Sequence, residues 1–164
     1  QTNDGFVLAE LPYGQGNYVM DIILPDTREG TAGLLPLMTT ENYNSWLEAM
    51  HVRETEISLP KFKYGYKEKL KEILSDMGMG IAFSDFAGFD NISDLSLKIN
   101  NVTHQTFIET NEEGTEAAAA TVVEIVNTSM PMIYYLNIDH SFIYIIRETS
   151  TNTILFMGRV DDPQ

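Results

Sequence analysis

Three histidines, His51, His104 and His140, are the side chains of this sequence that ordinarily titrate near neutral pH. One of them stands in the triplet Asp139-His140-Ser141, whose residue types are those of an acyl-transfer relay. Neighbouring residues of an extended segment point to opposite faces, so we predict that this triplet does not form a hydrogen-bonded relay. The sequence also lacks the HExxH and GxSxG patterns of metalloproteases and serine hydrolases. We therefore predict that the protein is not an enzyme.

Cation binding has one candidate, the carboxylates of Asp85, Asp90 and Asp94 in a turn-rich stretch. Their spacing does not match a calcium-binding loop, and a solvated acidic surface is the simpler interpretation. The sequence contains no cysteine, which excludes a thiolate nucleophile, a disulfide and a cysteine-based metal site. Because no phosphate-cradling glycine motif occurs either, we expect neither a metal nor a cofactor.

The balance of charge restricts the partners. Ten Lys and Arg stand against 24 Asp and Glu, a formal net charge of −14 in 164 residues. Such a field repels phosphate backbones and anionic lipids, so we expect no nucleic acid and no membrane as a partner. No basic stripe of the kind that binds a polyanion is apparent. The length and a hydrophobic content of 43% are those of a globular domain.

One acidic and alanine-rich segment has no simple structural interpretation. Its residues are Glu112, Glu113, Gly114, Thr115, Glu116, Ala117, Ala118, Ala119, Ala120 and Thr121. Alanines after glutamates favour a helix, whereas the residues that follow are β-branched and favour a strand. As a strand, the face that runs from Thr115 to Ile125 is uncharged, and Glu116 and Glu124 lie on the other face. The segment is therefore suited to change structure and to enter a sheet.

The surrounding patterns predict an α+β fold, because strands and helices do not alternate regularly and no repeat occurs. Two hairpins are expected from apolar runs that flank turn residues. The first has strands over 6–11 and 18–24, and the second has strands over 142–146 and 154–157.

Apolar residues at helical spacing predict a helix after Thr39, and its buried stripe contains the only tryptophan, Trp46. A second helix with an apolar stripe from Leu70 to Met77 is expected to end at Gly78. Further strands are predicted over 52–62 and 95–107.

Motifs along nearly the whole chain resemble the serpin family. They are Leu24-Pro25-Asp26, Ile57-Ser58-Leu59-Pro60-Lys61-Phe62, Leu74 to Phe83, His104 to Thr121, Leu136 to Ile146, and the ending Ile154 to Val160 with Pro163. The stretch from Leu136 to Ile146 looks like the family signature, and residues 112–121 resemble the reactive-centre hinge. The resemblance implies a fold of three β-sheets and surrounding helices, of which residues 1–164 are about the C-terminal half.

The resemblance further implies that residues 112–131 are the hinge and reactive-centre loop, and that 95–109 is the strand beside the site of insertion. His104 stands where serpins keep a buried, structural histidine. Half a domain does not bury enough surface to fold alone, so an N-terminal serpin fragment is an expected partner. The start at Gln1 looks like a cut from a longer chain, and we expect an extracytoplasmic protein, secreted or on the cell surface, with its signal upstream.

The function that the resemblance implies is suicide inhibition of serine proteases, and also of cysteine proteases. The protease forms an acyl-enzyme at the reactive bond, and the cleaved loop inserts into the central sheet. An ungapped count from Gly114 places this bond at Thr128-Ser129, with Val126 and Asn127 as neighbours. Such side chains favour an elastase-like target or one of relaxed specificity. The alternative is a non-inhibitory carrier or chaperone, which the hinge disfavours because it contains no bulky residue or proline.

Overall fold

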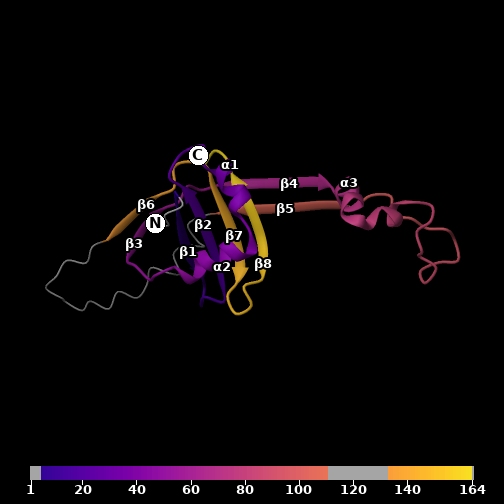
Figure 1. The fold of residues 1–164 in the computed structure, drawn as a ribbon, viewed down its shortest axis with the longest axis horizontal. Helices are drawn as coiled ribbons and strands as arrows, with labels where there is room; N and C mark the ends of the chain where they lie inside the picture. Colours follow the sequence, from indigo (N-terminus) through magenta and orange to yellow (C-terminus); the bar gives the residue numbers. More distant parts are fainter. Residues whose placement is uncertain (1–4, 111–132, 164) are drawn as a thin grey trace. The chain divides into compact units, whose positions relative to one another are not determined.

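The structure is a computed structural model that describes residues 5–110 and 133–163 (Figure 1). These residues belong to two compact units. The first contains the residues that precede and follow 63–109 in the sequence, and the second contains residues 63–109. Strands and helices are mixed, as predicted for an α+β fold, and the described residues form three sheets. No helix among them is long and apolar enough to span a membrane.

A four-stranded antiparallel sheet made of two hairpins is the base of the first unit. The strand β1 (Phe6–Tyr13) pairs with β2 (Tyr18–Pro25), and β7 (Phe142–Glu148) pairs with β8 (Ile154–Val160). Both hairpins confirm the sequence predictions. The strand order β1-β2-β7-β8 places β2 beside β7, so strands from opposite ends of the chain form the centre of the sheet.

The turn between β7 and β8 is held by one carboxylate. Glu148 accepts hydrogen bonds from the backbone N–H groups of Ser150 (3.0 Å) and Thr151 (2.8 Å) and from both of their hydroxyls (3.0 and 2.7 Å). These bonds, those of the hydroxyls first, lower the pKa of Glu148 to about 2. The stabilisation of the turn is therefore fully present above the ordinary pKa of a glutamate and is lost as the pH falls toward 2.

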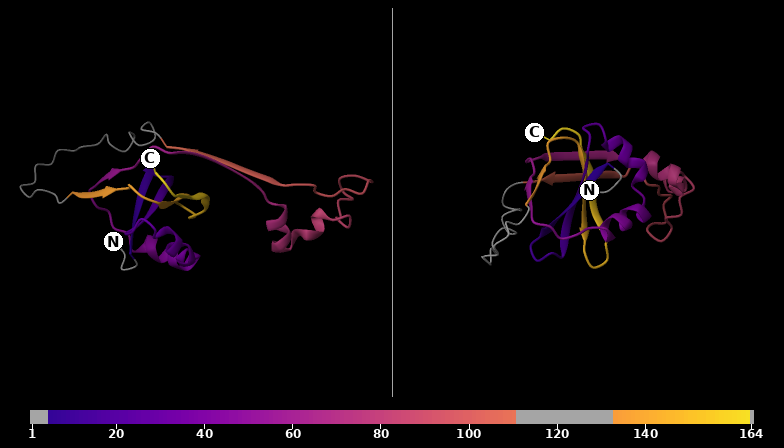
Figure 2. Two further views of the ribbon diagram at one scale, coloured as in Figure 1. Left: turned by 90° about the horizontal axis from the view of Figure 1, so that it is seen from above. Right: turned by 60° about the vertical axis from the view of Figure 1, so that its left-hand side comes forward.

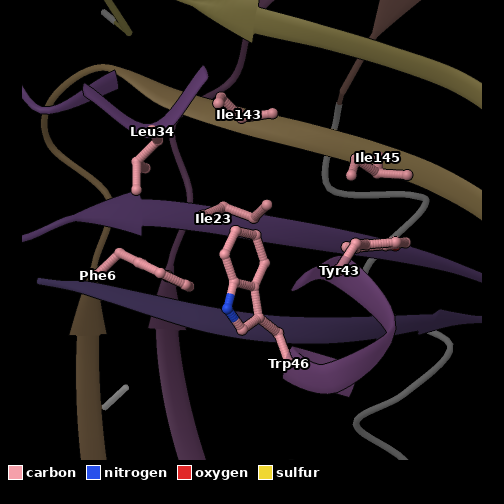
Figure 3. Close-up of a cluster of buried hydrophobic side chains, with 7 residues drawn as sticks. All are labelled: Phe6, Ile23, Leu34, Tyr43, Trp46, Ile143 and Ile145. Atoms are coloured by element: carbon pink, nitrogen blue, oxygen red, sulfur yellow. The ribbon is translucent and has the colours of Figure 1, made fainter. Parts of the chain in front are cut away.

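The core of the first unit lies between the sheet and two helices, α1 (Thr31–Leu34) and α2 (Thr40–Glu48). Helix α2 begins where Thr39 accepts a hydrogen bond from the backbone N–H of Asn42 at 3.2 Å. The buried cluster consists of Phe6, Ile23, Leu34, Tyr43, Trp46, Ile143 and Ile145 (Figure 3). The ring of Trp46 meets that of Phe6 edge-on at 4.7 Å. The helix after Thr39 and the core position of Trp46 were correctly predicted.

A short parallel pair completes the first unit. The strand β3 (Thr55–Ser58) follows α1, the single turn η1 (Leu35–Leu37) and α2, and it pairs with β6 (Tyr134–Asn137). The strand predicted over 52–62 is thus too long at both ends. Pro60 lacks the N–H that would continue the ladder, and the chain enters another strand at Lys63.

The second unit is an antiparallel ribbon with helical turns after its first strand. The strand β4 (Lys63–Lys69) pairs with β5 (Thr103–Glu109), and the two lie side by side in Figure 1 and in the right-hand view of Figure 2. Between them come α3 (Lys71–Leu74), η2 (Ser75–Met79) and η3 (Gly80–Phe83). Gly78 ends the helical path with a φ of 101°, as predicted, but the α-helix itself stops at Leu74.

The prediction of a strand over 95–107 is wrong about both ends, because the observed strand β5 begins at Thr103 and ends at Glu109. Its ladder begins at Thr103, opposite Lys69, because β4 ends at Lys69 and offers no partner beyond it. The backbone N–H of Ile99 instead donates to the carbonyl of Ala82 at 2.9 Å. Alternating side chains alone therefore did not reveal which part of the segment has a pairing strand.

Candidate functional site

The segment that the sequence analysis assigns to the site lies outside the described residues. This holds for Glu112, Glu113, Gly114, Thr115, Glu116, Ala117, Ala118, Ala119, Ala120 and Thr121, and for Val126, Asn127, Thr128 and Ser129. The structure does describe the chain on both sides of this segment, up to Thr110 and again from Ile133. We call these two flanking parts of the chain the first and the second anchor.

The first anchor joins Thr110 to the core. The backbone N–H of Thr110 donates to the carbonyl of Phe62 at 3.0 Å, and the N–H of Phe62 donates to the Thr110 hydroxyl at 3.0 Å. Phe62 is buried, and its ring lies edge-on to that of Phe142 at 5.6 Å. The residue that precedes residues 111–132 is therefore tied to the centre of the four-stranded sheet.

The strand β5 leads into this anchor and carries His104. It pairs with β4 along one edge, and no other described strand pairs with it. His104 lies opposite Glu68 in the ladder and is exposed in this chain. The buried role that the resemblance implies for His104 stays a prediction for the complete protein.

The second anchor is β6. Its ladder with β3 is extended at both ends, where Tyr134 N–H donates to the Glu54 carbonyl at 3.1 Å and Ile138 N–H donates to the Ser58 carbonyl at 2.9 Å. Leu136 is almost fully buried. Both ends of the segment over 111–132 are thus fixed by backbone hydrogen bonds.

The triplet Asp139-His140-Ser141 follows β6, and one part of its prediction is wrong. His140 Nδ1 lies 2.8 Å from Asp139 Oδ1, so the two side chains do form a hydrogen bond. The rule of opposite faces fails here because residues 138–141 form a bend and not a strand. The hydrogen bond from His140 and the nearby Arg28 lower the pKa of Asp139.

Ser141 completes no relay with this pair. Its hydroxyl donates to the Arg28 carbonyl at 2.7 Å, and the other ring nitrogen of His140, Nε2, lies 2.6 Å from the Pro25 carbonyl. A ring nitrogen near a carbonyl oxygen must donate, so Nε2 is not free to accept a proton from a hydroxyl. The triplet thus forms hydrogen bonds to the end of β2 and to the chain that follows it, which is the geometry of a structural contact.

The candidate cation site is not assembled either. Asp85 pairs with Lys98, whose Nζ lies 2.6 Å from the carboxylate, and this hydrogen bond lowers the pKa of Asp85. Among the residues that the structure describes, no three His, Cys, Asp or Glu side chains form a group that could hold a metal ion.

A buried ionic network is the feature that sequence reasoning missed. Arg147 Nε donates to Asp21 Oδ2 at 2.7 Å, and the side chain of Asp21 is fully buried. The same guanidinium donates to Glu10 and, at 2.9 Å, to Asn152 Oδ1. It therefore ties both hairpins together. The sequence signal was a charged residue inside each of two apolar runs, Asp21 in 19–24 and Arg147 after 142–146.

Asp21 also accepts a hydrogen bond from the hydroxyl of Tyr43 on helix α2. Burial, and then this bond to Asp21, raise the pKa of Tyr43, which stays protonated and can donate. The other carboxylate oxygen, Oδ1, has no hydrogen-bond partner among the described residues. The charge of Asp21 is consequently compensated from one side only, by Arg147.

The model of the serpin family, described as serine protease inhibitor, matches residues 1–163. The chain belongs to the serpin family. It is 38% identical over 159 residues to Iripin-3 of Ixodes ricinus, 36% identical over 162 residues to serine proteinase inhibitor 1 of variola virus, and 40% identical over 161 residues to human serpin B10. These matches cover 96%, 98% and 94% of the chain and 40%, 43% and 40% of the relatives.

Solved serpin structures agree with this assignment. Uncleaved ovalbumin matches with a TM-score of 0.80 and 29% identity over 97% of the chain and 40% of its own. Thyroxine-binding globulin in complex with thyroxine matches with a TM-score of 0.82 and 27% identity over 100% of the chain and 43% of its own. The predicted serpin fold is confirmed, and the chain spans about two fifths of the length of these serpins.

The ionic network leads to a prediction about stability. In the complete protein, Arg147→Met leaves the buried carboxylate of Asp21 without its cation, and we expect the free energy of unfolding to fall by about 3–5 kcal/mol. Urea denaturation measures this loss. Arg28→Met is the matched control, because Arg28 pairs with Asp139 on the surface at 3.8 Å and its loss should change stability by no more than about 1 kcal/mol.

A second substitution distinguishes lost charge compensation from lost packing. Asp21→Asn added to Arg147→Met removes the uncompensated charge and keeps an oxygen for the Tyr43 hydroxyl. We expect the double variant to be more stable than Arg147→Met alone. Equal or lower stability of the double variant would show that Arg147 acts through packing alone.

Proposed function

We propose that the complete serpin of which this chain forms part inhibits serine proteases, and by the same acyl chemistry cysteine proteases, by trapping them as acyl-enzymes. The protease hydroxyl attacks the carbonyl carbon of Thr128, an ester forms, and the bond from Thr128 to Ser129 breaks. The Ser129 nitrogen leaves as an amine and carries away a proton. Inhibition requires that the ester is not hydrolysed before the protease is deformed.

The observation that carries this proposal is that every second residue from Thr115 to Ile125 is uncharged, in a segment that follows β5 in the chain. In a strand these residues would share one face. An entering strand needs a partner with unpaired backbone groups and a face that tolerates burial. The edge of β5 away from β4, which no described strand occupies, is a suitable partner. About a dozen inserted residues at ~0.5–1.5 kcal/mol for each backbone hydrogen bond give on the order of 10 kcal/mol, which is similar to the stability of a whole domain.

The same proposal includes the N-terminal part of the serpin. In this chain β8 exposes large apolar side chains, among them Phe156 and Met157, which are 50% and 57% exposed. Contiguous apolar surface of this kind marks an interface. We expect the N-terminal part to cover β8 and to supply the remaining strands of the sheet that receives the loop.

The proposal also covers the target protease and the compartment in which the serpin acts. We expect an elastase-like protease or one of relaxed specificity, because the residues around the reactive bond are small or β-branched. A trypsin-like pocket would leave its buried carboxylate unpaired against them. We also expect an extracytoplasmic protein. A carrier role, as in thyroxine-binding globulin, whose structure holds thyroxine, is the alternative, and the alanine-rich hinge favours the inhibitor.

Covalent trapping is tested by incubation of the complete protein with a panel of serine proteases. With an elastase-like enzyme we expect a complex that survives denaturing electrophoresis, because an ester joins the two chains. A panel in which every protease stays active and only cleaved serpin accumulates would support the non-inhibitory alternative.

The hinge is tested by Thr115→Arg. A guanidinium that enters the sheet early without a partner carries a desolvation cost of several kcal/mol, so insertion slows and the ester is hydrolysed. We expect the variant to behave as a substrate, with a stoichiometry of inhibition raised at least about tenfold. The matched control is Glu116→Arg on the opposite strand face, which should keep the stoichiometry near that of the wild type; equal effects of the two variants would contradict the assignment of faces.

The reactive bond is located by intact-mass analysis of the C-terminal peptide released on cleavage. We expect this peptide to begin at Ser129, because the ungapped count from Gly114 ends there. A peptide that begins outside residues 127–129 would show that the loop contains a gap relative to the family pattern.

A further inference from the structure

The positive charge of this chain is concentrated in one short stretch. Residues 61–71 contain five of the ten Lys and Arg and a single acidic residue, Glu68. The rest of the chain has five basic and 23 acidic side chains, a net charge of −18. A basic stripe was not apparent from the sequence because glutamate and aromatic residues interrupt it, but β4 sorts the residue types by face.

Alternation along β4 places Lys63, Lys67 and Lys69 on one face of the ribbon, which we call the lysine face. All residues of β4 are exposed. Across the ladder, Lys67 lies opposite Gln105 and Lys69 lies opposite Thr103, both uncharged. Neither lysine forms an ion pair with a described residue, whereas Lys63 pairs with Glu109 at 3.2 Å.

The ribbon has a second feature beside the lysine face. The strand β4 pairs with β5 along one edge, and along its other edge it has no partner strand among the described residues. The backbone N–H and C=O groups along that edge can accept a further strand. Lysines on an edge strand also discourage pairing with like or apolar strands, so a partner has to bring negative charge.

We propose that the lysine face and the adjacent edge of β4 bind an extended acidic peptide segment of a partner protein. In a strand added to β4, side chains of one face repeat about every 6.6–6.8 Å, as the lysines do, so alternate carboxylates lie opposite Lys67 and Lys69. The ribbon is about 20 Å long, so a peptide segment of about seven residues can pair with β4 along its whole length. A long polyanion would extend beyond it and meet the net negative charge of the rest of the chain.

The probe is an acetylated and amidated octapeptide of alternating Glu and Thr, and its binding to the complete serpin is measured by fluorescence anisotropy at low salt. A peptide with four Glu followed by four Thr has the same charge and is the first control. We expect the alternating peptide to bind at least about tenfold more tightly. Two further peptides carry methyl groups on the backbone nitrogens of the Glu residues or of the Thr residues. We expect one of these two peptides to lose binding, because only one set of N–H groups faces β4 and donates to it.

Variants of the protein test the site itself. Lys67→Glu with Lys69→Glu should weaken binding of the alternating peptide at least about tenfold. Lys98→Glu with Arg28→Glu changes the net charge equally at two other exposed positions and should leave binding within about threefold. Circular dichroism and protease inhibition, measured on every variant, separate failure of this site from misfolding and from failure of the proposed inhibitory function.

Three results would overturn the proposal. They are the absence of binding to the wild-type protein, equal binding of the alternating and block peptides, and equal loss in the two double variants. Tighter binding of a sulfated oligosaccharide of the same charge would likewise replace the peptide site with a general polyanion site.

Discussion

The pairing of β2 with β7 is the constraint on which the first unit depends. It joins residues 18–23 to residues 143–148 and so makes one sheet of two hairpins that the chain forms far apart in sequence. The Arg147 guanidinium reaches Asp21 because the two strands are neighbours, and the aromatic core beneath α2 needs Phe6 from one hairpin and Ile145 from the other. The anchor at Thr110 also ends in this sheet, through Phe62 and Phe142.

Features encoded by neighbours in sequence were predictable. Both hairpins, the helix after Thr39 and the burial of Trp46 depend on alternation, on turn residues and on helical spacing, all of which are local. The family resemblance depends on ordered motifs and gave the fold, which the structural relatives confirm. Of the segment over 112–129 the sequence supplies the composition and the spacing, and its role remains a proposal.

Features that depend on a distant partner were not predictable. The start of β5 is set by the end of β4 at Lys69, which the pattern over 95–107 does not contain. The ionic network requires knowledge that β2 and β7 are adjacent. The hydrogen bond between the His140 ring and the Asp139 carboxylate depends on a bend that the sequence does not distinguish from a strand. In each case the residue types are visible in the local sequence, but the geometry depends on a partner segment that the local sequence does not identify.

The two anchors at Thr110 and Ile133 make cleavage of the intervening chain strongly asymmetric. A cut after Thr128 leaves eighteen residues, 111–128, attached to Thr110 and four residues, 129–132, attached to Ile133. Fully extended, these arms reach at most about 60–65 Å and about 13–14 Å. In the proposed mechanism the acyl bond would belong to the long arm, so a captured protease would be carried on a tether comparable in length to a globular domain. Under the proposed inhibition, the length of the long arm would limit the distance over which the bound protease can move.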